Sequence, residues 1–99
     1  MKESQLEAKV VKHCRDRGIL CYKFSSPAHR GVPDRLLIKD GKVLFLELKA
    51  EGKRPTRLQV REMQLLWYAG VQSEWVDTYQ RAVEVIDDAF VTVNIGSLL

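Results

Sequence analysis

Two short apolar runs separated by an Asp-Gly turn constrain the fold of this chain more than any other feature. The first run covers residues 35–38 and the second residues 43–49, with Asp40 and Gly41 in the connection between them. An Asp-Gly pair between such runs is the strongest short-range signal of a β-hairpin, because both turn residues must accept positive φ angles. The sequence therefore predicts two antiparallel strands joined by a tight turn.

The same hairpin brings two carboxylates together. Pairing counted outward from the turn sets Leu36 opposite Phe45 and Asp34 opposite Glu47, provided that no bulge shifts the register. The second pair falls at a non-hydrogen-bonded position, where Cβ atoms lie roughly 4.5–5.5 Å apart and like charges destabilise the sheet. A divalent cation between the carboxylates removes this conflict, and hard oxygen ligands suit Mg²⁺ or Mn²⁺. We therefore expect a metal site at Asp34 and Glu47.

Strand alternation adds a lysine to this cluster. Lys49 lies two residues after Glu47 and therefore shares its face of the strand. The opposite, buried face is predicted to carry three leucines, namely Leu44, Leu46 and Leu48. A lysine that orients or helps to deprotonate a water, beside two carboxylates that hold a metal, is an apparatus for phosphodiester hydrolysis. The alternative is an ordinary hairpin with solvated charged ends, but such a hairpin would favour opposite charges across the pair.

A helix and a strand are predicted before the hairpin. Ser4 to Glu7 has the Ser-x-x-Glu form of a capping box, and apolar residues then recur at helical spacing until Gly18. Residues 19–24 form a short run rich in β-formers, which predicts a strand. Residues 25–33 are dense in Ser, Pro and Gly, which predicts a loop before the first strand of the hairpin.

A helix, a strand and a helix are predicted after the hairpin. Thr56 to Gln59 has a second capping-box pattern, and the helix that it opens is predicted to end at Gly70. Residues 71–76 indicate a strand, and residues 77–80 can cap a last helix. The predicted order of elements is therefore α-β-β-β-α-β-α. The apolar faces of the two helices are predicted to include Leu58, Leu65, Leu66 and Ala69 in the first, and Ala82, Val83, Val85, Ile86 and Ala89 in the second.

The composition fits one small folded domain. The chain has 99 residues of which 45% are hydrophobic, so residues 1–99 are predicted to form a single domain around one core. A formal net charge of +3 leans toward a polyanionic partner without requiring one. No stretch has the pattern of a signal peptide or the length of a membrane span, so we expect a cytoplasmic protein with no membrane association. Residues 91–99 are apolar but weakly patterned, and they could form an extra strand, a tail over the core or a dimer contact.

The cysteines and tryptophans carry weaker signals. Cys14 and Cys21 have no His at zinc-ligand spacing, and the sequence suggests no disulfide framework, so they are interpreted as reduced interior thiols. Trp67 and Trp75 are interpreted as core or interface aromatics rather than as platforms for stacking bases.

Several of these residues together match a known pattern. Pro33-Asp34 followed by Glu47-Leu48-Lys49 resembles the P-D…E-x-K signature of the PD-(D/E)XK nuclease superfamily. The wider context, with Gly31-Val32 before Pro33, Phe45-Leu46 before Glu47 and Leu58-Gln59 downstream, is similar to the VRR-NUC family. The resemblance extends from Glu7 to Val76, and free-standing members of this family are phage and bacterial proteins of about this length. It implies an α/β fold with the PD-(D/E)XK nuclease core, in which a mixed central sheet is flanked by helices.

The resemblance also implies roles for individual residues. Asp34, Glu47 and the carbonyl of Leu48 would be the metal ligands, and Lys49 the catalytic lysine. Gln59 would be an active-site residue contributed by a helix, and Glu7 an accessory carboxylate. Gln59 and Glu7 are also the fourth residues of the two capping-box patterns, so each could instead only bond the start of its own helix.

Basic residues flank the motif on both sides. His29 and Arg30 lie in the loop just before it, where contact with phosphate and plain solvation are both open. Lys53, Arg54 and Arg57 lie near a predicted helix N-terminus, where side-chain charge and backbone amides both favour phosphate.

The function expected from these features is metal-dependent hydrolysis of DNA phosphodiester bonds by an endonuclease using Mg²⁺ or Mn²⁺. The resemblance to free-standing family members implies branched DNA such as Holliday junctions as substrate, and a homodimer in which two sites act on two strands. If the protein is encoded by a phage, the cytoplasm is that of a bacterial host. The alternatives are a non-catalytic nucleic-acid-binding module on the same fold, and a structural interaction domain that a divalent-metal titration would distinguish. A non-catalytic module would be expected to lack Asp34, Glu47 or Lys49, and all three are present.

Overall fold

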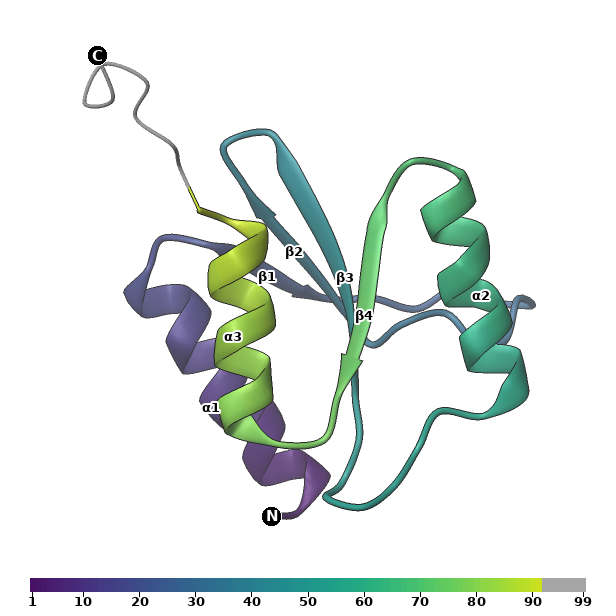
Figure 1. The fold of residues 1–99 in the computed structure, drawn as a ribbon, viewed down its shortest axis with the longest axis horizontal. Helices are drawn as coiled ribbons and strands as arrows, with labels where there is room; N and C mark the ends of the chain where they lie inside the picture. Colours follow the sequence, from purple (N-terminus) through teal and green to yellow (C-terminus); the bar gives the residue numbers. More distant parts are fainter. Residues whose placement is uncertain (92–99) are drawn as a thin grey trace.

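The computed structural model describes residues 1–91, which form three helices and four strands (Figure 1). Their order, α-β-β-β-α-β-α, is the predicted one. The bounds are α1 (Glu3–Asp16), β1 (Leu20–Lys23), β2 (Arg35–Lys39), β3 (Lys42–Leu48), α2 (Arg57–Tyr68), β4 (Gln72–Val76) and α3 (Tyr79–Ala89). The alternatives for residues 91–99 fall almost entirely outside the described residues. Within residues 1–91, no helix is long and apolar enough to cross a membrane.

The four strands form one mixed sheet in the order β1-β2-β3-β4. The pairs β1·β2 and β2·β3 are antiparallel, whereas β4 runs parallel to β3. The register of the hairpin is the predicted one, with Leu36 opposite Phe45. The turn adopts the required backbone, since Asp40 has φ 51° and Gly41 has φ 75°. The local chemistry of this turn therefore fixes which side chains of β2 and β3 share a face.

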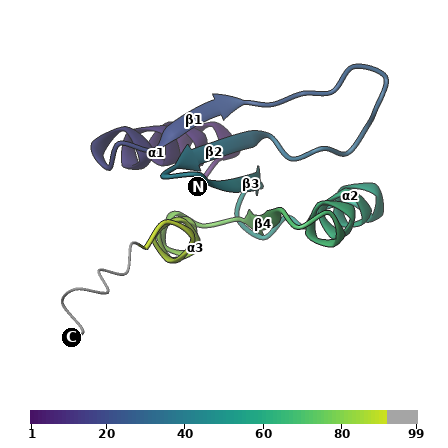
Figure 2. The ribbon, with the colours of Figure 1, turned by 90° about the horizontal axis from the view of Figure 1, so that it is seen from above.

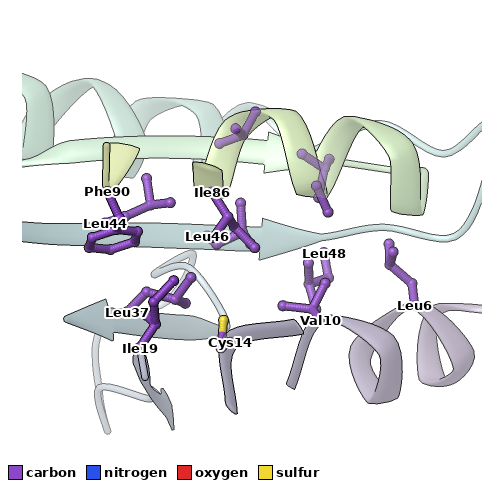
Figure 3. Close-up of a cluster of buried hydrophobic side chains, with 13 residues drawn as sticks. Leu6, Val10, Cys14, Ile19, Leu37, Leu44, Leu46, Leu48, Ile86 and Phe90 are labelled. Atoms are coloured by element: carbon purple, nitrogen blue, oxygen red, sulfur yellow. The ribbon is translucent and has the colours of Figure 1, made fainter. Parts of the chain in front are cut away.

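Helices cover the two faces of the sheet unequally. α1 and α3 pack side by side on one face, and α2 lies alone against the other face beside β4 (Figures 1 and 2). The core lies under α1 and α3, where the predicted leucines of β3, Leu44, Leu46 and Leu48, are fully buried (Figure 3). α3 contributes Ala82, Val85 and Ile86 to this core, and the Thr78 hydroxyl accepts the Arg81 N–H at its start.

Of the two capping boxes predicted from the sequence, the structure contains the one at α2 and not the one at α1. At α2, the Gln59 N–H donates to Thr56 Oγ1 and the Thr56 N–H donates to Gln59 Oε1, which confirms the capping box. At α1, the helix begins at Glu3, and the Lys2 N–H donates to Gln5 Oε1 at 2.9 Å. The predicted capping box from Ser4 to Glu7 is therefore wrong, because the chain enters the helix earlier and leaves Glu7 free for another contact.

The apolar face predicted for α2 is only partly buried. Leu58 and Leu65 are 43% and 48% exposed, Ala69 is exposed, and Leu66 is half-buried. Met63 is the one buried residue within α2. The prediction fails because α2 packs mainly on β4 and has no second helix beside it on that face of the sheet. Helical spacing identified side chains that share a face, but nothing in the described chain covers most of them.

The loop between β1 and β2 is attached to α2 at two points. The His29 Nε2 atom lies 2.9 Å from Glu62 Oε2, and Gly31 packs against the backbone of Leu58. Gly31 has φ 89°, and a Cβ atom added there would lie 2.9 Å from Leu58 Cγ and 3.1 Å from its carbonyl oxygen. Glycine is therefore required at this position for both its backbone conformation and its lack of a side chain.

Replacing Gly31 by Ala is expected to lower the free energy of unfolding more than the same change at Gly52. Gly52 also has a positive φ angle, 83°, but nothing lies within 4 Å of its added Cβ, so it reports the backbone penalty alone. That penalty is about 1–2 kcal/mol, and the contact with Leu58 should add about 1–3 kcal/mol for Gly31→Ala. Urea denaturation of both variants measures the difference. Equal destabilisation would mean that the loop does not pack closely on α2.

Candidate active site

Asp34 and Glu47 lie at the same end of the β2–β3 hairpin. Glu47 is in β3, on the face toward α2, and Asp34 directly precedes the Arg35–Leu46 pair that ends the ladder. The Leu48 N–H donates to Asp34 Oδ2 at 3.2 Å, which holds Asp34 against the strand that carries Glu47. The hairpin register thus brings the two carboxylates together, as the sequence predicts.

Glu47 is buried, with 3% of its surface exposed. Burial and the adjacent negative charge of Asp34 raise the pKa of the Glu47 carboxyl from 4.5 to about 7, against the opposing effect of Lys49. A carboxyl group that is buried beside another negative charge is costly to ionise unless a cation stabilises its charged form. Burial and repulsion from Asp34 therefore disfavour the charged form of Glu47, and a bound cation would stabilise that form.

Lys49 and Gln59 both approach the same oxygen of Glu47. The Lys49 Nζ atom lies 3.7 Å from Glu47 Oε2, and Gln59 Nε2 donates to that oxygen at 3.2 Å. Gln59 meanwhile uses its own Oε1 to accept the Thr56 N–H. The two ends of one amide therefore bond the helix start and the Glu47 carboxylate at once, so the capping bond does not prevent Gln59 from contacting the predicted site.

Glu7 has a different position from the one expected of an accessory carboxylate. Its Oε1 atom lies 3.0 Å from Arg35 Nη2, in an ion pair between α1 and β2. The acidic residue of α1 whose charge helps to raise the pKa of Glu47 is Glu3. Glu3 was not predicted from the sequence, because its proximity to Glu47 depends on how the first turn of α1 lies beside the end of β3. The only local signal was its position in the first turn of a helix.

The basic residues around the motif divide into two groups. Arg30, Lys53, Arg54 and Arg57 are exposed and form no ion pair within residues 1–91. His29 is instead paired with Glu62. Lys53, Arg54 and Arg57 precede or begin α2, the helix whose Gln59 contacts Glu47. The exposed cations near this helix start are thus close in sequence to an active-site contact.

The tryptophans lie on or near the sheet face that α2 covers. Trp75 is half-buried and pairs in register with Glu47 across β3 and β4. Trp67 is half exposed, and its Nε1–H donates to the Ser73 carbonyl at 2.7 Å. This hydrogen bond anchors α2 to β4, so Trp67 has a structural contact despite its exposure.

The residues at the site fit a hard divalent cation. Glu47 Oε1 is buried and has no hydrogen-bond partner among the described residues, although it lies beside a second carboxylate. Such an oxygen is expected to be satisfied by an ion or a water. No group of three or more His, Cys, Asp or Glu side chains suited to a metal occurs within residues 1–91. A site of two carboxylates completed by water suits Mg²⁺, which binds through one or two carboxylates and keeps several waters.

Comparison with known proteins agrees with this architecture. The chain is 44% identical over 73 residues to "Putative nuclease p44" of Acyrthosiphon pisum secondary endosymbiont phage 1, an alignment covering 73% of this chain and 78% of the phage protein. A solved structure described as "VRR_NUC domain" superposes with a TM-score of 0.82 at 24% identity, covering 91% of this chain and 99% of the other. A second, described as "VRR_NUC domain protein", gives a TM-score of 0.76 at 15% identity and covers 91% and 88% of the two chains.

A scan against models of known protein families finds no match. The superposed structures nevertheless share the fold of this chain, a mixed four-stranded sheet flanked by helices. On this combination of sequence, fold and site geometry, the chain belongs to the VRR-NUC family.

Proposed function

We propose that this protein is an endonuclease that hydrolyses DNA phosphodiester bonds and depends on Mg²⁺ or Mn²⁺. The observation that carries the proposal is the buried Oε1 atom of Glu47, which lies beside Asp34 and has no hydrogen-bond partner within residues 1–91, with Lys49 and Gln59 at the other oxygen. A plain structural carboxylate would have both oxygens bonded or solvated. The phage relative described as a nuclease supports the same assignment.

Each residue of the site has a distinct part in this mechanism. Asp34 and Glu47, with the carbonyl of Leu48, would hold the cation. The bound ion would supply Lewis acidity at the scissile phosphate and make a coordinated water more acidic. Lys49, whose Nζ atom lies 3.7 Å from Glu47 Oε2, orients the attacking water, and its positive charge stabilises the hydroxide that the water forms when it loses a proton to solvent. Gln59 holds the Glu47 side chain in place through the 3.2 Å hydrogen bond.

DNA is held by cations outside the reacting group. Lys53, Arg54 and Arg57 gather at the start of α2, where the free backbone amides of the first helical turn add to their charge. Arg30 lies in the loop that packs on the same helix through Gly31. His29 contributes in a different way, because its contact with Glu62 fixes that loop against α2. These side chains supply most of the affinity for the phosphate backbone.

The substrate proposed within this class is branched DNA such as a Holliday junction, cut by a homodimer. A two-fold dimer presents two metal sites to two strands, which is what paired incision requires. Large apolar side chains suited to such a contact are exposed on the sheet and on α2. They include Leu20, Tyr22 and Val43 in the sheet and Leu65 and Tyr68 in α2. The protein would act in the cytoplasm, which is that of a bacterial host if the protein is encoded by a phage.

The experiment incubates purified protein with Mn²⁺ or Mg²⁺ and a panel of linear, nicked, flapped and four-way DNA, with RNA of matched sequence alongside. We expect incision that requires the ion, stops with EDTA and is strongest on the four-way junction. DNA binding without cleavage under either ion would instead indicate a non-catalytic binding module. Light scattering in the same buffer tests the dimer, and a monomer with full activity on junctions would contradict it.

A further inference from the structure

A second cluster of reactive side chains lies between α1 and the first two strands. It consists of Glu7 and Cys14 from α1, Cys21 from β1 and Arg35 from β2. Glu7 and Cys14 are two helical turns apart, so they share one face of α1. On the sheet, Cys21 pairs with Leu37 and Lys23 with Arg35, so Cys21 and Arg35 share a face and are diagonal neighbours. The fold therefore lines up four polar groups beneath one helix.

The contacts within this cluster are specific. Cys21 packs against the core cluster that contains Cys14, and the Cys14 thiol and the Arg35 guanidinium are its polar neighbours. Arg35 also pairs with Glu7, with 3.0 Å between Nη2 and Oε1. Both cysteines are free thiols. Cys14 is fully buried in the core (Figure 3), whereas Cys21 is half-buried and packs against that core. Cys21 is thus partly exposed, and Cys14 belongs to the core against which it packs.

Arg35 favours the thiolate form of Cys21, which is the nucleophilic form of a cysteine. Its buried Nε–H has no hydrogen-bond acceptor among the described residues, so a negative charge on the adjacent sulfur would stabilise it. The hydrogen bond from Cys14 and the charge of Arg35 lower the pKa of the Cys21 thiol to about 7, against the opposing effect of burial. The same hydrogen bond and burial raise the pKa of Cys14. A cationic neighbour, partial exposure and a second thiol in contact are the marks of a redox-active cysteine.

We propose that Cys14 and Cys21 form a redox-active dithiol that a hydroperoxide oxidises to a disulfide. The Cys21 thiolate attacks one peroxide oxygen, the O–O bond breaks, and the products are a sulfenic acid on Cys21 and hydroxide, which takes up a proton. The Cys14 sulfur then loses its proton and attacks the Cys21 sulfur, and the second oxygen leaves as water. With hydrogen peroxide, two thiols and one peroxide give one disulfide and two waters, and a dithiol reductant reverses the change.

The disulfide would fasten α1 to β1 on the face of the sheet opposite Glu47. It closes the short loop of residues 15–20, so it restricts the unfolded chain and should raise the melting temperature of the oxidised protein. For a domain of this size the rise is expected to be on the order of 5–10 °C. Among the described residues, the hydrogen bonds and ion pairs of Asp34, Glu47 and Lys49 involve neither cysteine, so this readout is independent of nuclease activity.

The test compares the reduced protein with protein treated with hydrogen peroxide. Intact mass should fall by two hydrogens per chain, peptide mapping should give a Cys14–Cys21 bridge, and the melting temperature should rise and return with dithiothreitol. Cys21→Ser and Cys14→Ala serve as separate controls that should show neither the bridge nor the rise. A chain that gains oxygen atoms instead of losing hydrogens, or that links only to a second copy on a non-reducing gel, would overturn the proposal. A rise of equal size in Cys21→Ser would overturn it as well.

Discussion

Replacing Glu47 by Gln is expected to lower the rate of metal-dependent DNA cleavage by at least about 10³-fold, since it removes a charged metal ligand. The fold should persist, because the amide keeps an oxygen that can accept the hydrogen bond from Gln59 Nε2. Glu47→Gln also removes the buried negative charge beside Asp34, so the free energy of unfolding without metal should not fall. Lys49→Ala should reduce cleavage by about 10²–10⁴-fold, the range typical of a positioned proton-transfer group.

DNA affinity should be nearly unchanged in both variants, because the exposed cations near α2 carry the phosphate contacts. The matched controls are Glu74→Gln, a half-buried carboxylate on β4 that faces away from Glu47, and Lys12→Ala, an exposed lysine of α1. Cleavage rates under single-turnover conditions and fluorescence anisotropy for binding separate the two effects. Undiminished cleavage by either active-site variant would remove the proposed mechanism, and an equal loss in the controls would point to a general defect.

Adding Mn²⁺ to the wild-type protein is expected to raise its melting temperature by about 10–20 °C. A ligand at roughly a hundredfold excess over its Kd contributes about 2.7 kcal/mol, and each kcal/mol shifts the melting temperature of a domain of this size by about 4–8 °C. Asp34→Asn loses a charged ligand and should respond much less. Its amide oxygen can still accept the Leu48 N–H, so the hairpin end stays in place.

Without metal, Asp34→Asn should be more stable than the wild-type protein, which is the opposite of the order expected with Mn²⁺. The size of this difference depends on the pH of the measurement. The pKa of Glu47 is raised in the folded state from 4.5 to about 7. The protonated Glu47 side chain therefore contributes fully to the free energy of unfolding below pH 4.5. This contribution, roughly 3 kcal/mol in total, is lost as the pH rises through about 7. Above pH 8 the Glu47 carboxylate is charged beside Asp34, and replacing Asp34 by Asn should stabilise the protein by about 0.2–1 kcal/mol.

Melting curves at pH 8.5 with EDTA and with Mn²⁺, for wild type and Asp34→Asn, test this reversal. Asp40→Asn provides the control, because it makes the same change in the exposed hairpin turn at a φ angle of 51° that Asn also tolerates. That variant should respond to metal as wild type does. If Asp34→Asn is no more stable without metal and responds equally to it, the two carboxylates do not share a cation.

The sequence was most informative where structure depends on neighbours along the chain. The Asp40-Gly41 turn determined the register of β2 and β3, and with it the meeting of Asp34 and Glu47. The Thr56 capping box was equally local and equally well predicted. The pairing of β4 alongside β3 depends on a long connection, and the mixed sheet was expected only from the family resemblance.

The failures share a dependence on distant residues. The pattern from Ser4 to Glu7 satisfies a local rule, but Arg35 of β2 competes for the Glu7 carboxylate. The spacing of Leu58 and Leu65 shows which side chains of α2 share a face, but not whether another element covers them. Glu3 near Glu47 and the contact between Cys14 and Cys21 require knowledge of how α1 lies on the sheet. No periodicity in the sequence contains that information.

The hairpin also limits how this protein can change in length. Glu47 and Leu48 are adjacent residues of β3 that face opposite sides of the sheet, one toward α2 and one into the core beneath α1 and α3. Inserting or deleting a single residue in β3 between the turn and Glu47 would exchange these faces, and would send the carboxylate into the leucine core. A change of two residues would restore the alternation but move Glu47 past Asp34. Insertions and deletions in related sequences are therefore expected in the β1–β2 loop away from Gly31 and after α3. The number of residues between Gly41 and Lys49 is expected to stay constant.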